Sequence, residues 1–198
     1  MQNRLLSTRN MAKISILAVI AFVLMYFEFP LPFIAPPFYQ IDFSEIPVLI
    51  GGFAISPMAA VIIELFKNLL NVIFQGTATA FVGELSNFIV GCAFVVPASL
   101  IYRHQKTKKN AVIGLSVGVI SMAVIGFISN LFFVIPAYVK FMNLPLESII
   151  AMASNIFPFI DSTFLLVLCC TTPFNLIKGI LSSVITLVIY KHISPLLK

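Results

Sequence analysis

The sequence predicts an all-α membrane protein with six transmembrane helices, and three observations support this fold class. Of the 198 residues, 60% are hydrophobic and only 10% are charged. The mean hydropathy is +1.08, and most basic residues gather in short clusters between apolar runs. Because a soluble domain carries about 25% charged residues, this chain could not cover its surface in water. We therefore expect a single lipid-embedded domain, residues 1–198.

The basic residues predict the orientation in the membrane. Nine of the 12 lysines and arginines fall in three clusters, namely Arg4, Arg9 and Lys13; Arg103, Lys106, Lys108 and Lys109; and Lys191 and Lys198. Basic residues beside membrane spans mark the cytoplasmic side. Both termini are therefore predicted to be cytoplasmic, with an even number of crossings between successive clusters. No soluble basic face is expected, which argues against nucleic-acid binding.

The first half of the chain predicts four helices. We expect the first at residues 11–27, and four prolines between positions 30 and 37 then exclude helix. Residues 28–42 are therefore predicted to form a long outer loop between helices 1 and 2. The second helix, 45–55, rises only about 16 Å against a hydrocarbon core of about 30 Å. We expect it to be tilted, buried among its neighbours or continued by the loop. The next two helices are expected at 57–74 and 80–102.

The second half predicts two further spans. The fifth helix is expected at residues 111–134, ended by Pro136, and a short outer helix at 145–156. The sixth helix is expected to begin at Thr172-Pro173 and to run to about residue 191. Four crossings before the central basic cluster and two after it satisfy the even-number condition.

Polar residues within the sixth helix predict a ligand site. An ionisable group at membrane depth costs about 2.5–3.5 kcal/mol on insertion scales. Lys178 follows Pro173 by five residues and so lies about 7.5 Å below the outer end of that helix. Asn175 shares its face, being three residues away. An amide beside an ammonium group suits a ligand rich in carbonyls and ring nitrogens, and the alternative is an internal Lys–Glu bridge with a structural asparagine.

Two further pairs repeat the three-residue spacing. Glu84 and Asn87 lie just inside the outer end of the fourth helix, where Glu84 either neutralises Lys178 or binds ligand hydroxyls. Glu64 and Lys67, on the third helix, predict a self-contained ion pair. We therefore expect Glu84 and Asn87 to form one wall of a site, and Glu64 and Lys67 to form a structural ion pair on the neighbouring helix.

Three further groups of residues have structural or functional interpretations. Asn130, in the apolar fifth helix, predicts an interhelical hydrogen bond. Phe38, Tyr39 and Phe43 lie on a loop able to fold over a cavity. Small residues recur on the first helix at Ala12, Ser15, Ala18 and Ala21. Small residues let another helix approach closely, which would serve either partner docking or internal packing.

The sequence contains no motif for ATP hydrolysis or for common catalytic chemistry. There is no GxxxxGK[ST] phosphate loop and no HExxH, and the one GxSxG string, at residues 114–118, lies within the expected fifth helix and not at a strand-to-helix elbow. No spacing of histidines and cysteines predicts a metal site, and no cofactor is expected. We therefore predict that the chain is not an enzyme.

Four segments carry a resemblance to a known family. They are Phe27-Glu28-Phe29-Pro30, Ile41-Asp42-Phe43-Ser44-Glu45-Ile46-Pro47, Gly83-Glu84-Leu85-Ser86-Asn87-Phe88 and Pro173-Phe174-Asn175-Leu176-Ile177-Lys178-Gly179. With them the chain resembles the substrate-binding S components of energy-coupling factor (ECF) vitamin transporters, and is most similar to the riboflavin-specific ones. The segments span nearly the whole chain.

The resemblance implies riboflavin uptake through a cavity open to the outside, with the loop between helices 1 and 2 as its lid. It implies that Asn175, Lys178 and Asn130 bind the polar edge of the ring, and that further residues contact the ring or the ribityl chain. Those further residues are Asp42, Phe43, Thr79 and Glu84. The spacing within the fourth helix adds Asn87 as a candidate. A flat ligand with a polar edge suits apolar walls and a few convergent polar groups.

The resemblance also implies partners and a location. The partners are a transmembrane T component and two cytoplasmic ATPase subunits, and the location is the plasma membrane of a bacterium. Three alternatives stay open. They are an S component for another vitamin, a small membrane enzyme using Glu84 or Lys178 as acid or base, and a structural membrane protein.

Overall fold

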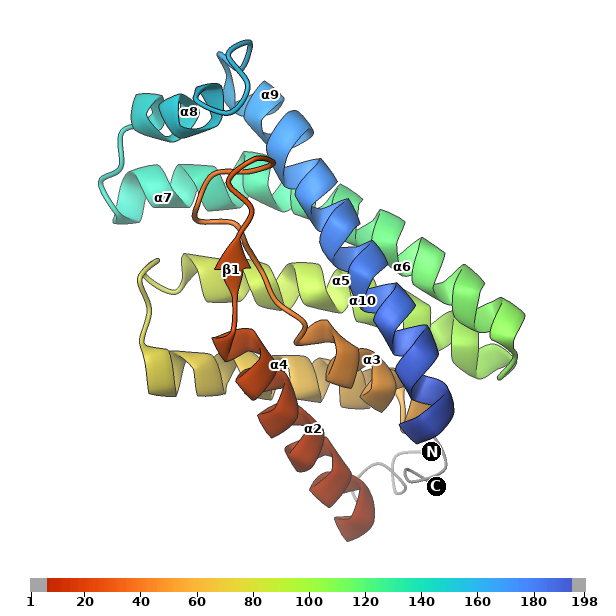
Figure 1. Ribbon diagram of the computed structural model, residues 1–198. Coiled ribbons are helices and arrows are strands. Elements are labelled where there is room, and N and C mark those ends of the chain that lie inside the picture. The colour runs from red at the N-terminus through yellow and green to blue at the C-terminus, as the bar shows by residue number, and fades with distance from the viewer. Residues whose placement is uncertain (1–6, 194–198) are drawn as a thin grey trace.

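The computed structural model describes residues 7–193 and is mostly helical (Figure 1). Arg4 and Lys198, used above to predict the cytoplasmic side, lie outside this range. The elements in chain order are α2 (Thr8–Tyr26), β1 (Phe29–Pro30), β2 (Gln40–Ile41), α3 (Glu45–Ala54), α4 (Pro57–Gln75), α5 (Val82–His104), α6 (Lys108–Ser129), the π-helical segment η1 (Asn130–Val134), α7 (Ile135–Phe141), α8 (Leu146–Ser154), α9 (Thr163–Leu166), the π-helical segment η2 (Val167–Thr171) and α10 (Thr172–Ile193). The strands β1 and β2 pair antiparallel within the predicted outer loop.

Five helical stretches within the described residues are long and apolar enough to cross a membrane. They are Thr8–Tyr26, Pro57–Gln75, Val82–His104, Lys108–Phe141 and Thr163–Lys191. The remaining expected helix, the second one at 45–55, corresponds to α3, which has only ten residues, nine of them buried. It packs among α2, α4, α5 and α10. The prediction that this helix is short and enclosed by its neighbours is confirmed.

The prolines do not delimit the last two spans, so this part of the prediction is wrong. The fifth helix runs through Pro136 to Phe141, and the sixth begins at Thr163, before Pro173. In both, a five-residue π-helical segment ends two residues before the proline. A wider turn at that point accommodates a proline ring that would otherwise clash with the preceding turn. The two π-helical segments contact each other.

Helices α5 and α6 form a closely packed hairpin. A Cβ atom at Gly114 would lie 2.7 Å from the carbonyl oxygen of Ala98. The absence of a side chain at Gly114 therefore lets the two backbones approach closely. The hairpin brings α6 and η1 beside α5, and this positions one wall of the site described below.

The connections sort to two sides of the bundle in Figure 1. The beginning of α2, the α5–α6 turn and the end of α10 lie toward the right of this view. The α4–α5 and α7–α8 connections lie toward the left. Elements that the basic residues assigned to one membrane side thus share one side of the bundle.

The small residues of α2 do not form one exposed stripe. Ala18 and Ala21 are buried inside the bundle, whereas Ala12 and Ser15 are exposed. A repeat of three falls short of the 3.6 residues of a helical turn, so the row winds around the helix. Internal packing therefore accounts for the second pair of residues, and only the first pair is open to a partner.

Candidate ligand-binding cavity

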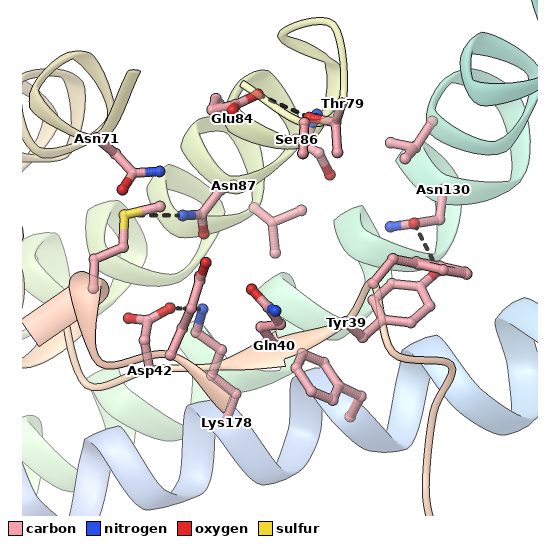
Figure 2. Close-up of a pocket in the computed structure, with 18 of the residues that line it drawn as sticks. Tyr39, Gln40, Asp42, Asn71, Thr79, Glu84, Ser86, Asn87, Asn130 and Lys178 are labelled. Carbon is pink, nitrogen blue, oxygen red and sulfur yellow. Dashed lines mark hydrogen bonds and ion pairs between the residues drawn. The ribbon is translucent and has the colours of Figure 1, made fainter. Parts of the chain in front are cut away.

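A cavity of about 270 Å³ lies between the loop 27–44 and helices α4, α5, α6 and α10. This volume lies just below the roughly 300–1,000 Å³ typical of small-molecule sites. Figure 2 shows the labelled polar side chains around one space. The polar lining residues are Glu28, Tyr39, Gln40, Asp42, Asn71, Gln75, Thr79, Glu84, Ser86, Asn87, Asn130, Asn175 and Lys178. The apolar and aromatic walls include Met25, Phe38, Val90, Met122, Val134, Tyr138 and Phe174.

Lys178 of α10 pairs with Asp42, which follows β2. Lys178 Nζ lies 2.7 Å from Asp42 Oδ2, and both side chains are buried. The backbone N–H of Ser44 donates to the other oxygen, Asp42 Oδ1, at 2.7 Å. Burial alone would raise the pKa of Asp42, but the charges of Lys178 and Lys67 and these hydrogen bonds lower it to about 2. The counter-charge of Lys178 is therefore Asp42, and the alternative assignment to Glu84 is wrong.

Tyr39 joins the loop to both π-helical segments. Its hydroxyl donates to Asn130 Oδ1 at 2.9 Å and lies 2.7 Å from Thr171 Oγ1. Asn130 Nδ2 donates to the carbonyl oxygen of Gly126 at 2.9 Å. Burial raises the pKa of Tyr39, which keeps the phenol neutral and able to donate. The amide of Asn130 is thus oriented by α6 and the loop together.

Asn175 lies one turn from Lys178 on α10 and lines the same cavity. A Cβ atom at Gly126 would collide with Asn175 Nδ2, so the glycine on α6 provides the room for this amide. Among residues 7–193 the structure gives the Asn175 side chain no hydrogen-bond partner. The amide is therefore available to a ligand.

Glu84 and Thr79 form the opposite polar wall, at the beginning of α5. The hydroxyls of Thr77 and Thr79 donate to Glu84 Oε2 at 3.2 and 3.0 Å. Asn87 lies one turn further along α5 and donates to Asn68 Oδ1 at 3.3 Å. Figure 2 shows Glu84 and Thr79 on the side of the cavity away from Lys178. The spacing of Glu84 and Asn87 therefore identified residues of one wall.

Two predictions need correction, one for Phe43 and one for the Glu64–Lys67 pair. Phe43 does not line the cavity and instead packs against the hydrophobic core of the bundle. The Glu64–Lys67 ion pair is confirmed, with Oε1 of Glu64 2.9 Å from Nζ. It is not self-contained, however, because Glu45 also contacts this ammonium group at 2.6 Å.

Sequence reasoning missed several residues of the lining. Glu28 and Gln40 lie in the proline-rich loop, and Asn71 lies on α4, one turn after Lys67. Burial, Asp42 and Glu84 raise the pKa of Glu28, which Lys178 only partly offsets. Asn71 continues the polar face that begins with Glu64 and Lys67, so helical periodicity would have found it. Loop residues follow no such period.

A comparison with known protein families assigns the chain to one of them. The family model described as "ECF transporter, substrate-specific component" matches residues 9–190. This chain belongs to that family. The resemblance stated from the four sequence segments is therefore confirmed.

Individual relatives of this S component are similar over almost their whole length. A riboflavin transporter RibU from Staphylococcus aureus is 36% identical, with 96% of this chain and 93% of that protein covered. A riboflavin transporter FmnP from Bacillus subtilis is 31% identical, with 96% and 94% covered. A solved structure described as the S component of a bacterial ECF transporter has a TM-score of 0.72 at 32% identity. The match covers 100% of this chain and 99% of the solved chain.

Proposed function

We propose that this S component takes up riboflavin, binding it from the outside with high affinity and working with an ATP-driven energising module. One observation carries the proposal. Lys178, Asn175 and Asn130, from two helices far apart in the sequence, converge on one aromatic-walled cavity in a chain 36% identical to a riboflavin transporter. The cavity would hold riboflavin as a transported ligand, not as a cofactor.

The chemistry of the lining suits this ligand. The flat ring of riboflavin would lie against the aromatic wall formed by Phe38, Tyr138 and Phe174. The amides of Asn175 and Asn130 and the ammonium group of Lys178 would meet its carbonyls and ring nitrogens. The hydroxylated tail would reach Asp42 and the polar wall of Thr79, Glu84 and Asn87.

We also propose the topology predicted from the basic residues, with one substrate-binding domain over residues 1–198. The chain would cross the membrane six times if α3 completes its crossing with the adjoining loop. The common side of the α2 start, the α5–α6 turn and the α10 end supports cytoplasmic termini (Figure 1). The hairpin of β1 and β2, which includes Gln40 beside the cavity, supports a role for the outer loop as a lid.

The partners would be a transmembrane T component and two cytoplasmic ATPase subunits in a bacterial plasma membrane. The absence of a phosphate-binding loop in the sequence supports an external source of energy. The exposed pair Ala12 and Ser15 would contribute to the docking face, where their small side chains permit close helix approach. We propose that the chain alone catalyses no reaction.

Uptake assays test this proposal. Cells unable to make riboflavin, and lacking their own importer, would express the chain with and without an ECF energising module. We expect growth on low external riboflavin only when the chain and the module are both present. We also expect the purified protein to be yellow from bound riboflavin. No growth on riboflavin, together with growth of cells that require a different vitamin when they express the chain and the module, would support the alternative of a different S component. Turnover of a substrate by the purified chain would support the enzyme alternative.

A further inference from the structure

A cluster of three charged side chains is completely buried outside the cavity. Lys67 Nζ lies 2.6 Å from Glu45 Oε1 on α3 and 2.9 Å from Glu64 Oε1 on its own helix, α4. All three side chains have no exposed surface, and none of them lines the cavity. The proposed binding of riboflavin therefore leaves these three groups without a role.

The cluster contains one more carboxyl group than ammonium groups. Of the other charged groups that face it, Asp42 and Lys178 neutralise each other at 2.7 Å. The thiol of Cys92 on α5 also faces the two carboxyl groups and supplies no positive charge. Two ionised carboxylates would therefore leave a net negative charge in a dry interior, which is strongly unfavourable.

The hydrogen bonding of the two carboxyl groups is also incomplete. Glu45 Oε2 and Glu64 Oε2 are buried, and neither has a hydrogen-bond partner among the described residues. Asp42 differs, because Ser44 donates to one of its oxygens and Lys178 to the other. Buried ionised carboxylates normally accept hydrogen bonds on both oxygens. The arrangement at Asp42 is that of a carboxylate, and the arrangement in the cluster is not.

The surroundings leave little room for a larger cation. A Cβ atom at Gly91 of α5 would collide with Glu64 Oε1 and lie 3.1 Å from Glu45 Oε1. The described residues contain no group of three or more histidine, cysteine or acidic side chains able to hold a metal ion. The missing positive charge must therefore come from a very small cation.

We propose that the Glu45–Glu64 pair binds one proton at neutral pH, which makes its cluster with Lys67 electrically neutral. The proton comes from water and adds to one carboxyl oxygen, and the remaining carboxylate pairs with the ammonium group. The shorter contact of Glu45 with Lys67 assigns the proton to Glu64.

The proton site is joined to the cavity through Ser44. Lys67 Nζ donates to Ser44 Oγ at 2.8 Å, and Ser44 N–H donates to Asp42 Oδ1 at 2.7 Å. A neutral cluster leaves Asp42 to its partner Lys178. Loss of the proton would leave the cluster with an uncompensated negative charge, and two hydrogen bonds join its Lys67 to Asp42 of the Asp42–Lys178 pair.

Infrared spectroscopy of the full chain, labelled with ¹³C-glutamate, tests the proposal at neutral pH. We expect the carbonyl stretch of a protonated glutamic acid in the wild type. The band should vanish in both Glu64→Gln and Glu45→Gln, because either change removes the need for the proton. It should persist in Glu147→Gln, an exposed control on α8, and in Glu28→Gln, which excludes the half-buried carboxyl group of the loop. Absence of the band in the wild type, or its persistence in both cluster variants, overturns the proposal.

Thermal unfolding in detergent gives a second readout. A folded chain that binds about one proton more than the unfolded chain loses stability as pH rises. Between about pH 5 and pH 7, where unfolded glutamates are ionised, the wild type should lose more stability than Glu64→Gln. Equal pH dependence would contradict the proton. Stabilisation of the wild type by sodium at constant ionic strength would show a metal ion in its place and also overturn the proposal.

Discussion

Lys178 Nζ lies 2.7 Å from Asp42 Oδ2, although 136 residues separate the two along the chain. The lysine lies within α10, and the aspartate ends the long loop just before α3. This ion pair fastens the loop to the last membrane span at the cavity. Both groups line the cavity as well, so the same contact orients the proposed ligand-binding ammonium group.

Breaking this ion pair from one side is expected to destabilise the fold. Lys178→Met leaves the buried Asp42 carboxylate without its partner, which costs about 3–5 kcal/mol in buried pairs. Unfolding of the purified chain in detergent measures the loss, with the exposed Lys106→Met as control. The double variant Asp42→Asn, Lys178→Met should recover part of the stability. A Lys178→Met chain as stable as the control would contradict the structural role of the pair.

Removing one hydroxyl should loosen the loop from both π-helical segments. In Tyr39→Phe, Asn130 Oδ1 and Thr171 Oγ1 lose their shared partner. Unsatisfied buried polar groups cost about 1–3 kcal/mol, so we expect a lower melting temperature and faster proteolysis within residues 27–44. Tyr26→Phe, at an exposed tyrosine, is the matched control. Identical proteolysis of the two variants would rule out this role of Tyr39.

Acid should weaken the fold through Asp42. Its pKa is about 2, below the ordinary value of 3.8, so the folded chain holds the ionised form more strongly than the unfolded chain. That stabilisation, roughly 2 kcal/mol, is fully present above pH 3.8 and is lost as pH falls toward 2. From about pH 5 to pH 3 the wild type should therefore lose more stability than Asp42→Asn. Parallel unfolding curves for the two proteins would contradict the assigned pKa.

The charge of the cavity predicts a preference among flavins, given the proposed function. Glu28, Asp42 and Glu84 face the cavity, and Lys178 is the single basic residue among its described lining. A phosphorylated flavin would bring further negative charge, so we expect it to bind more weakly than riboflavin. Glu84→Gln should lower the ratio of the dissociation constant of the phosphorylated flavin to that of riboflavin. The ratio should fall by about tenfold for each 1.4 kcal/mol of repulsion removed. An unchanged ratio would mean that the phosphate stays outside the reach of Glu84.

The sequence predicted the helices better than their ends. The short outer helix, expected at 145–156, is observed at Leu146–Ser154, and the buried α3 follows from its length. Pro136 and Pro173 misled the prediction, because a proline normally interrupts the hydrogen bonding of a helix. Here a π-helical turn before each proline absorbs the disruption, and no composition rule signals such a turn. The interior polar residue Asn130 begins one of these segments.

The candidate site was predictable where helical spacing applies. The pairs Asn175 with Lys178 and Glu84 with Asn87 were found because residues three apart share a face. The loop residues were harder to predict, since a chain rich in proline has no fixed period. Phe43, expected in the cavity, packs against the core instead. The identity of the partner of Lys178 also depends on the loop path, which only the folded structure supplies.

The most direct test of the central claim is a titration of riboflavin fluorescence with the purified chain. We expect the wild type to quench the fluorescence at one riboflavin per chain. Asn175→Ala and Lys178→Ala should each weaken binding by about 1–3 kcal/mol, whereas Asn155→Ala, at an exposed asparagine after α8, should leave it unchanged. Folded wild-type protein that leaves the fluorescence unquenched would contradict riboflavin binding at this cavity. So would three variants that all bind riboflavin with the affinity of the wild type.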